Sequence, residues 1–575
     1  MFTKFKEEVA TVLTQALKET GYETESDLLD LSLEESQHAD IATSISFKLA
    51  KIHKQNPKEI ANKIFNAIVI SEDTLISEKK VVGPYINFFV NREFLNKTLY
   101  NILSPQKKVI KEKVIIEHTS ANPNGPLHVG HIRNSVIGDT LARIFKKAGY
   151  DVETQYYVND MGRQIAIVVW GLDNFEFDES KKSDHAIADV YIKANRVIQE
   201  IARPSEKSEN RQALVHKKSE IDTLMQKYEK GDKETVEKFE NAVNLAISGI
   251  KTTLKKMNIH HDRYIWESEF VRSGFIKEVV ENIKSNGKIQ IENNALIVLL
   301  EGFEKGLVIQ RGDGTSLYST RDIAYHVWKA NQCHKMINIL GADHKLISSQ
   351  LKAVLKIINC TQPEIVIFEF VGLPSGSMST RRGKFISADE LLEEVEKQAF
   401  LEVDRRRSDM DLNFKKKVAN SVGIGAVRYD IVKVSADKAT TFDWKSALDF
   451  EKRGAPFIQY AHARACNILK KANQNIESLE FDPNLLILSQ EIDLIKKLSK
   501  FSYVINRSAQ ELKPHLFATY ARELAELFNQ FYRYVPVISA EDIRRIKARL
   551  ALVNCSRIVL ADTLATLGID APEEI

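Results

Sequence analysis

The pattern of apolar and polar positions divides the chain into three successive stretches. Up to about residue 106, apolar residues recur at helical spacing over 5–20 and 41–70, and the strand-like run VVGPYINFFV follows. Over 107–387 short apolar runs alternate with amphipathic segments, whereas the spacing from 388 onward is helical. We therefore expect an α+β N-terminal appendage (1–106), an α/β domain (107–387) and an all-α C-terminal part.

Gly and Pro punctuation suggests where these stretches are joined. The segment SPQKK at 104–108 is typical of a linker between the first two. Within the helical part, Gly and Pro at 454–456 separate a connecting region, 388–450, from a C-terminal domain, 451–575.

The start of the α/β stretch predicts a βαβ unit. VIIEH (114–118) is a short buried strand, and the helix IRNSVIGDTLARIFKKAGY keeps its apolar residues on one face, with Gly149 suited to the position after its end. DVETQYYVN is typical of a second strand. A strand, a crossover helix and a further strand imply a parallel sheet with right-handed connections.

A charge-dense segment interrupts this alternation between about 172 and 262. Its apolar positions are sparse, which predicts solvated helices inserted into the α/β domain and lying outside its sheet. The alternation of strands and helices resumes with ALIVLL (295–300), KMINILGADH (335–344) and IVIFEFVGL (365–373).

Composition restricts the class of protein. The chain has 575 residues, which suggests three to four domains, and its 43% hydrophobic and 28% charged residues are typical of a folded globular protein. No apolar run is long enough for a membrane span, and the amphipathic N-terminus does not resemble a signal peptide. The four cysteines lie far apart without a CxxC pair, so we expect no structural zinc and a reducing, cytoplasmic setting.

Charge gives only a weak indication of a partner. The net charge of +3 provides no bulk electrostatic argument for nucleic acid. Local basic clusters, such as Arg405–Arg407 and Lys415–Lys417, permit a polyanionic partner but are equally typical of solvated helix faces.

The strand–loop–helix junction carries the most distinctive residues. His128 and His131, with Gly130 between them, stand where the helix begins, and the N-terminus of a helix favours a bound anion. Histidines three apart lie on one side of a helix, so both can hydrogen-bond one phosphate, and Gly130 leaves room for a flat base. The common GxxxxGK[ST] and GxGxxG phosphate motifs are absent. The alternative is a pair of structural histidines, but the carboxyl end of a parallel strand is where α/β proteins bind ligands.

Here the resemblance to a family becomes specific. ANPNGPLHVGH resembles the "HIGH" signature of class I aminoacyl-tRNA synthetases, in the extended form of the arginyl-tRNA synthetases. Further stretches are similar to other elements of that family in the same order: YYVNDMGRQIA, GDGTSLYSTRDIAYH, MINILGADH, SMSTRRGKFI for the "KMSKS" loop, HADIATSISFKLAK and GPYINFFV in the head, and GAPFIQYAHARACNILKKA and LADTLATLGIDAPE in the tail. The similarity covers nearly the whole chain except the 172–262 insertion.

The resemblance implies an arginine–tRNA ligase. Its α/β domain would be a Rossmann-like catalytic domain, flanked by a tRNA-binding N-terminal appendage and an all-α anticodon-binding domain. The reaction would join L-arginine to tRNA(Arg) through an arginyl-adenylate, with ATP entering as its Mg²⁺ complex and activation depending on bound tRNA. The family also implies a monomer with no membrane partner.

Site residues follow from the same resemblance. The positions implied for ATP are His128, Gly130, His131, Asp343, Met378 and Ser379. Those implied for arginine are Glu117, Ser120, Asn122, His131, Tyr318, Asp322 and His344. Those implied for catalysis are His128, His131 and Arg381. No protein metal ligands are expected.

Physical reasoning supports some of these positions and leaves alternatives for others. A guanidinium needs a carboxylate partner, and Asp322 shares a helical face with Tyr318 four positions earlier. The alternative is a capping carboxylate and a core tyrosine. Glu117 is equally compatible with a structural carboxylate, and His344 replaces the glutamine of many arginyl enzymes.

The second signature departs from the family pattern. Both lysines of KMSKS are absent from Ser377–Arg381, and Gly125 stands where some arginyl enzymes carry a compensating lysine. Arg381, Arg382 or Lys384 can supply the positive charge, although an arginine differs from lysine in geometry. The alternative is a basic surface loop.

The C-terminal helices mix aromatic with basic residues, as suits the unstacked bases of an anticodon loop. These residues are Arg428, Tyr429, Tyr460, His462, Arg464, Phe528, Phe531, Tyr532 and Tyr534. Phe528, Phe531 and Tyr532 at helical spacing are also typical of a core. Two other classes therefore stay open beside the ligase: a catalytically silent tRNA-binding paralogue, favoured by the missing lysines, and a nucleotidyltransferase that makes a small-molecule adenylate.

Overall fold

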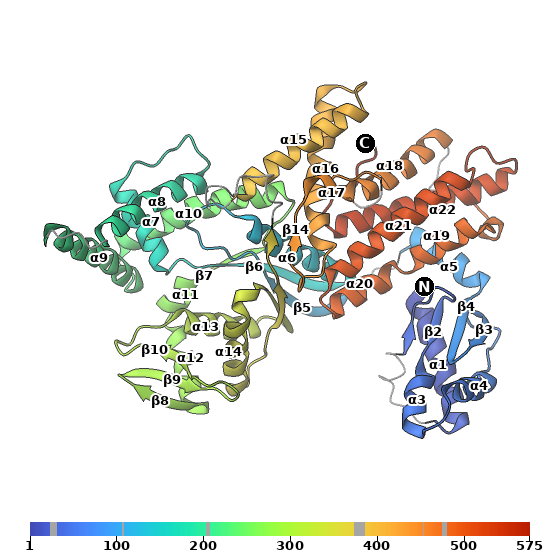
Figure 1. The fold of residues 1–575 in the computed structure, drawn as a ribbon, viewed down its shortest axis with the longest axis horizontal. Helices are drawn as coiled ribbons and strands as arrows, with labels where there is room; N and C mark the ends of the chain where they lie inside the picture. The colour runs from blue at the N-terminus through green and yellow to red at the C-terminus, as the bar shows by residue number, and fades with distance from the viewer. Residues whose placement is uncertain (23–31, 106–108, 203–207, 373–385, 452–453, 474–479) are drawn as a thin grey trace.

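The computed structural model describes residues 1–22, 32–105, 109–202, 208–372, 386–451, 454–473 and 480–575, with side chains described for all of these except 199–202 and 208–218. Figure 1 shows an elongated molecule in which an N-terminal unit and a helical C-terminal region lie toward one end, and the helices α7–α10 lie toward the other.

The N-terminal unit is an antiparallel sheet covered by helices. Its strands follow the order β1-β2-β4-β3. The elements are α1 (Phe2–Thr20), β1 (Leu33–Glu34), β2 (Ile41–Thr43), α3 (Ile45–His53), α4 (Pro57–Ala67), β3 (Ile76–Val82), β4 (Tyr85–Val90) and the following helix α5 (Arg92–Leu103).

One prediction for this unit was wrong in detail. The stretch 41–70, predicted as helical, begins with β2, which pairs with β4, and then forms two separate helices. The break has a local cause, because Asn56 accepts a hydrogen bond from the Lys58 N–H and Pro57 opens a new helix at its first position.

The centre of the molecule is a five-stranded parallel sheet, as the βαβ pattern predicted. Its strand order is β12-β11-β5-β6-β7, and every neighbouring pair is parallel. The strands are β5 (Ile110–Glu117), β6 (Tyr150–Val158), β7 (Arg263–Trp266), β11 (Lys335–Gly341) and β12 (Glu364–Phe368). The chain runs outward from β5 in one direction and later returns to β11 on its other side, so the order reverses between these two strands. A ligand crevice is expected at their carboxyl ends.

The first crossover helix, α6 (Val129–Ala148), is buried along most of its length. Gly149 follows it with a φ of 104°, the left-handed conformation predicted for that position. Arg133 of α6 is fully buried and donates hydrogen bonds to five backbone carbonyls, those of Glu369, Phe370, Ser435, Ala436 and Lys438. The helix is thereby fixed to two segments far away in sequence.

The predicted insertion is helical. It contains α8 (Ser183–Ala202), α9 (Ser208–Glu229) and α10 (Lys233–Lys256), and α7 (Arg163–Asn174) leads into it. Its description as solvated was only partly correct, because α10 buries an apolar stripe that includes Phe239, Val243 and Ile250. After it, β7 rejoins the edge of the parallel sheet.

A smaller subdomain follows, and it departs from the expected alternation. The strands β8 (Lys288–Glu292), β9 (Ala295–Leu299) and β10 (Leu307–Gln310) form their own antiparallel sheet. The run ALIVLL therefore lies outside the parallel sheet, since the tight turn at Asn293 and Asn294, both with positive φ, makes a hairpin. The helices beside it are α11 (Glu267–Arg272), α12 (Phe275–Asn286), α13 (Tyr318–Ala330) and α14 (Lys345–Ile357), the last preceded by the turn η1 (Ala342–His344).

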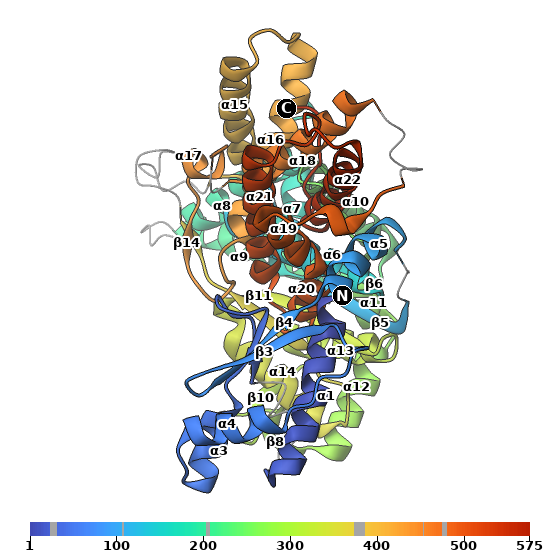
Figure 2. The same cartoon turned by 90° about the vertical axis from the view of Figure 1, so that its right-hand side faces the viewer.

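The rest of the chain is almost entirely helical. The strand pair β13 (Val371–Gly372) and β14 (Thr440–Thr441) is its one small sheet among the described residues. The helices are α15 (Ala388–Arg406), α16 (Leu412–Val432), α17 (Trp444–Ala447), α18 (Ala455–Ala472), α19 (Ser489–Ser499), α20 (Phe501–Gln510), α21 (Pro514–Tyr534) and α22 (Ile543–Thr566), with the turn η3 (Pro483–Leu485). Figure 2 shows these helices stacked above the N-terminal unit, which they contact through α5.

Within the described part of the chain, no helix combines the length and apolar character that crossing a bilayer requires.

Candidate active site

The predicted site residues gather at the carboxyl ends of β5 and β11. The backbone leaves β5 through a strained turn, with φ of 69° at Thr119 and 40° at Ser120. The side chain of Asn134 holds this turn, because its Oδ1 accepts from the Thr119 N–H at 2.6 Å and its Nδ2 donates to the carbonyl of Ile339 on β11 at 2.9 Å. One amide thus ties the ends of both strands to α6, and such strain is typical of a functional site.

His128 and His131 form the start of α6. His128 is the N-cap residue, its Nδ1 accepting from the Gly130 N–H at 3.1 Å, while Nδ1 of His131 accepts from the His128 N–H at 3.2 Å. The two rings stack with their centroids 3.6 Å apart. Burial lowers the pKa of both histidines, and for His131, where the neighbouring His128 adds to the effect, to about 3. Each ring is therefore neutral at pH 7, and because its Nδ1 accepts, its proton resides on Nε2.

Glycine at position 130 also has a reason within the loop itself. A Cβ there would lie 2.9 Å from Cε1 of His128. The absence of a side chain therefore makes room for the stacked histidine ring itself.

The residues after β11 lie at the carboxyl end of that strand. Asp343 and His344 occupy the turn η1, and their side chains are largely exposed and lie 3.6 Å apart. Asn122, also exposed, donates to Oε1 of Gln164 at 3.1 Å. These side chains are therefore accessible to a ligand.

The expected arginine-pocket residues lie on α13, where Tyr318 and Asp322 occupy the first turns. The carboxylate of Asp322 lies 3.2 Å from Nδ1 of His326, one turn further along the same helix. The side chain of Asp322 keeps 18% exposure, and that of Tyr318 is exposed. Both stay within reach of solvent and hence of a ligand.

Glu267 is a buried carboxylate close to Asp322 that sequence reasoning missed. Its carboxylate is fully buried and forms an ion pair with Arg321 at 3.2 Å, yet neither oxygen has a well-aligned hydrogen bond to a described residue. Burial raises its pKa to about 7, and the repulsion from Asp160 and Asp322 adds to the shift. The nearby Tyr157 hydroxyl is likewise buried without a partner in the described structure. Unsatisfied buried polar groups beside Asp322 suit a bound cation with several donors.

The feature of the sequence that could have identified Glu267 is its position directly after a strand. It directly follows β7, so it stands at the same carboxyl edge of the sheet as Glu117. Recognising it required knowing that β7 belongs to this sheet, which the four-residue run RYIW does not establish by itself.

Glu117 is placed at this edge as predicted, but its carboxylate already has a cationic partner. Nζ of Lys329, on α13, donates to its Oε2 at 2.7 Å, and Lys329 has no exposed side-chain surface. The hydroxyl of Ser120 lies 3.4 Å from the other oxygen, Oε1. Glu117 thus combines a structural ion pair with a second oxygen facing the strained turn.

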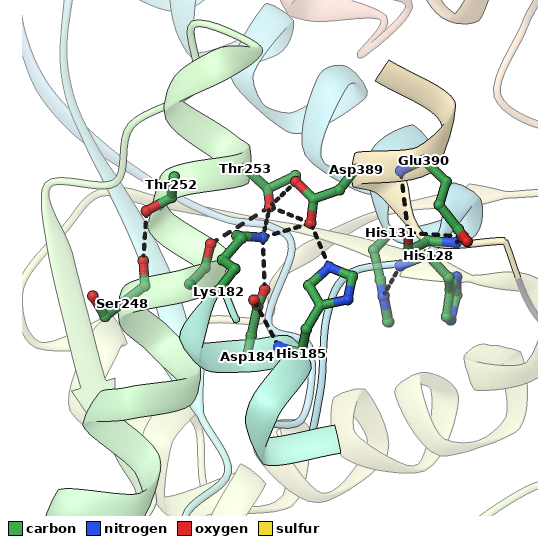
Figure 3. A network of polar contacts seen from close by, with 12 residues as sticks. His128, His131, Lys182, Asp184, His185, Ser248, Thr252, Thr253, Asp389 and Glu390 are labelled. Carbon is green, nitrogen blue, oxygen red and sulfur yellow. Dashed lines mark hydrogen bonds and ion pairs between the residues drawn. The ribbon is translucent and has the colours of Figure 1, made fainter. Parts of the chain in front are cut away.

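A second polar network links the histidine loop to the insertion (Figure 3). The Ala388 N–H donates to the carbonyl of Leu127 at 2.7 Å, which fixes the start of α15 against the loop before α6. Asp389 then reaches back to Nζ of Lys182 at 2.5 Å and to Nε2 of His185 at 2.9 Å. Oγ1 of Thr253 in α10 donates to the same carboxylate at 3.0 Å.

Asp184, His185 and Asp389 have the composition of a metal-ligand set, and their ligand atoms lie within 4.8 Å of one another. Nζ of Lys182 lies 2.9 Å from the Asp184 carboxylate as well as beside Asp389. The lysine ammonium therefore already provides the cation that the two carboxylates need.

Met378, Ser379 and Arg381, together with the rest of the SMSTR loop, lie outside the described residues.

The C-terminal helices enclose a cavity of about 1570 Å³. Its lining includes Tyr460, Arg464, Tyr532, Tyr534 and the further arginines Arg406, Arg407, Arg522 and Arg533. The guanidinium of Arg464 lies over the rings of Tyr460 (4.2 Å) and Tyr532 (4.9 Å). Phe528 and Phe531 are fully buried, which confirms the core alternative for them.

Arg428 and His462 are buried as well, so they form part of the packing. The guanidinium of Arg428 donates to the Asp139 carboxylate of α6 and to the carbonyls of Met257 and Leu567. It thereby connects α6, which packs on the parallel sheet, to the helical region.

Comparison with known proteins agrees with this geometry along the whole chain. Residues 91–444 match the family described as tRNA synthetases class I (R), catalytic domain. Residues 458–575 match the DALR anticodon binding domain, and residues 7–90 the arginyl tRNA synthetase N terminal domain.

Similar sequences and structures point the same way. The chain is 54% identical to the arginine–tRNA ligase of Methanosarcina mazei and 47% identical to that of Archaeoglobus fulgidus, with all of both chains covered in each case. Its structure is similar to the arginyl-tRNA synthetase of Thermus thermophilus, with a TM-score of 0.83 and 26% identity over 99% of this chain and 100% of the other. The chain belongs to the arginyl-tRNA synthetases of class I.

Proposed function

We propose that this protein is an arginine–tRNA ligase that forms arginyl-adenylate from L-arginine and ATP and then transfers arginine to the 3′ end of tRNA(Arg). The observation that carries the proposal is that hydrogen-bond donors suited to phosphate and carboxylates suited to a guanidinium lie near the same edge of the sheet. Neutral histidine donors lie at the N-terminus of α6, after β5, and three carboxylates, Glu117, Glu267 and Asp322, lie close together at the ends of β5 and β7 and on α13.

The ATP half works by charge stabilisation. His128 and His131 direct Nε2–H groups and the positive end of the α6 dipole at the α-phosphate, where negative charge grows during attack. Because both imidazoles are neutral, they donate hydrogen bonds without exchanging protons. Asp343 binds the ribose hydroxyls, and Mg²⁺ enters with ATP and accompanies the departing pyrophosphate.

The arginine half works by matching charges. Asp322 and Glu267 receive the guanidinium, with Tyr318 beside it, while Oε1 of Glu117, Ser120 and Asn122 hold the α-amino end. The carboxylate of arginine then attacks the α-phosphate, the bond to pyrophosphate breaks, and no protein nucleophile takes part.

tRNA occupies the helical end of the molecule. The cavity lined by Tyr460, Arg464 and Tyr532 offers stacking surfaces and cations to anticodon bases, with the N-terminal unit as a second contact. We assign tRNA binding to 1–106 and 451–575, catalysis to 107–387 and a connecting role to 388–450. Activation depends on tRNA, and the SMSTR loop with Arg381 contributes charge to the phosphates. The enzyme acts as a cytoplasmic monomer.

The test is ATP-dependent attachment of radiolabelled arginine to tRNA(Arg), with His131→Ala beside the wild type. We expect charging by the wild type and a loss of about 10²-fold in kcat for the variant, because one donor to the developing charge is removed. Tight tRNA binding without charging by the wild type would instead support the silent paralogue. Preference for another amino acid would overturn the assignment of the pocket.

A further inference from the structure

We propose that Lys329, Asn338 and His326 are positioning residues that hold the two carboxylates at the ends of the arginine pocket, Glu117 and Asp322, at a fixed separation. This inference deepens the proposed function and rests on it.

The contacts form one continuous buried chain. Nζ of Lys329 donates to Oε2 of Glu117 at 2.7 Å and to Oδ1 of Asn338 at 3.0 Å. Nδ2 of Asn338 lies 2.6 Å from Nε2 of His326, and Nδ1 of His326 lies 2.8 Å from the carbonyl and 3.2 Å from the carboxylate of Asp322. The three linking side chains are almost inaccessible, with exposures of 0%, 2% and 1% for Lys329, Asn338 and His326.

The fold explains why these groups meet. β11 pairs with β5 in parallel, and the register places Asn338 directly opposite Glu117. Lys329 and His326 both lie on α13, three positions apart, so they face the strands from the same side of that helix.

The donors and acceptors of these side chains give the series of hydrogen bonds a direction. The ammonium of Lys329 has only donors, so Asn338 must turn its carbonyl oxygen toward it and its amide protons toward His326. Nε2 of His326 is then an acceptor, and the imidazole proton resides on Nδ1, which donates to the backbone carbonyl of Asp322 and lies 3.2 Å from its carboxylate. The buried lysine thus selects the histidine tautomer that places an N–H group beside the Asp322 carboxylate.

The consequence concerns amino-acid selection. The Glu117 carboxylate faces the α-amino end of the ligand, and the Asp322 carboxylate faces its guanidinium. A pocket that fixes the distance between these two carboxylates favours a ligand of one length. None of the three linking residues touches the ligand in this arrangement, so their effect is on the binding of arginine and not on the phosphates.

The decisive variant is Asn338→Asp, which changes one NH₂ to oxygen and keeps the shape. It removes the donor to His326 and so reverses the hydrogen bond between position 338 and His326, whereas Lys329 still donates to the new carboxylate. We expect the KM for arginine to rise about tenfold or more and the KM for ATP to stay within twofold. Asn195→Asp makes the same change at a partly buried position in α8, where the amide donates to the Tyr191 carbonyl at 3.1 Å, and should leave both KM values unchanged.

Two partial ligands test the link itself. n-Butylguanidine has only the guanidinium end of arginine, and norvaline has only the amino-acid end. The inference expects Asn338→Asp to weaken inhibition by both. Weakening of one alone, or an equal rise in the KM values for arginine and ATP, would overturn it.

A second pair of variants, at His326, tests the same inference if Asn338→Asp folds poorly. His326→Asn keeps an amide donor near the position of Nδ1, whereas His326→Leu has none. We expect about a threefold rise in arginine KM for the former and tenfold or more for the latter, at similar melting temperatures; equal effects would contradict the tautomer argument. Calorimetric binding of arginine to the same variants tests the chain even if the wild type fails to charge tRNA, which would refute only the proposed function.

Discussion

The arginine half and the ATP half that we propose for the site are held in place by different means. On the arginine side, the carboxylates of Glu117, Asp322 and Glu267 are oriented by contacts with buried side chains. These contacts are ion pairs and hydrogen bonds between side chains. On the ATP side, His128 and His131 are oriented by backbone N–H groups and by the backbone contact between Leu127 and Ala388.

The difference follows from what each half must recognise. Discrimination between amino acids needs charged groups at fixed positions in a dry pocket, because leaving a buried polar group unpaired is what penalises the wrong ligand. Phosphates are similar in every nucleotide, so a helix N-terminus and two neutral donors are sufficient. The arginine half therefore uses charged side chains for recognition, whereas the ATP half uses the helix dipole and neutral hydrogen-bond donors.

Removing a charge from the arginine half should have the largest effect. Asp322→Ala deletes the carboxylate that we propose meets the guanidinium and is expected to raise the KM for arginine by about 10²-fold, with little change in the KM for ATP. Steady-state charging at varied arginine and varied ATP measures both. The control is Asp313→Asn, an exposed carboxylate before the same helix whose bond to Thr315 survives as an amide oxygen. A rise below about threefold for Asp322→Ala would mean that this carboxylate is structural.

The two halves also differ in how far the sequence predicts them. The βαβ unit and the position of His128 and His131 follow from local periodicity and from loop composition, which a single sequence contains. The pairing of Lys329 with Glu117 joins residues 212 positions apart and depends on the register of β5 with β11, so no local pattern reveals it. The antiparallel subdomain of β8, β9 and β10 was missed for a related reason, since an apolar run has the same appearance in either sheet.

Acid should act on the two halves in opposite directions. Burial lowers the pKa of His118, beneath the loop of the ATP half, to about 3 and raises that of Glu267 in the arginine half to about 7. The unfolded state binds more protons than the native state at His118 below pH 6.5, so this group costs stability as pH falls. At Glu267 the native state binds more protons between pH 4.5 and 7, so this group adds stability as pH falls through that window.

Each contribution amounts to about 2 kcal/mol between pH 7 and 5 if the ordinary pKa values hold in the unfolded chain. Urea unfolding at both pH values measures it. His118→Asn should make the loss of stability on acidification smaller, whereas Glu267→Gln should make it larger. A shift of the same sign in both variants would contradict the assignment of a histidine with a lowered pKa to one half and a carboxyl with a raised pKa to the other.

The smallest expected effect tests whether the ATP half depends on any side-chain ion pair. Asp389→Asn weakens the contacts to Lys182 and His185 that hold the start of α15, and Ala388 beside it bonds the loop carrying His128. A charge-assisted hydrogen bond is worth about 1.5 kcal/mol or more, so we expect the KM for ATP to rise about tenfold while the KM for arginine stays constant.

The matched control is Asp189→Asn on the neighbouring surface, where the ion pair with Lys181 is exposed and contributes little. If both variants behave like the wild type, the backbone contacts alone hold the ATP half, and the contrast with the arginine half is complete. If Asp389→Asn instead raises the KM for arginine, the insertion acts on the whole crevice, because α8 and α10 would then transmit the change across β5 to the pocket formed by α13.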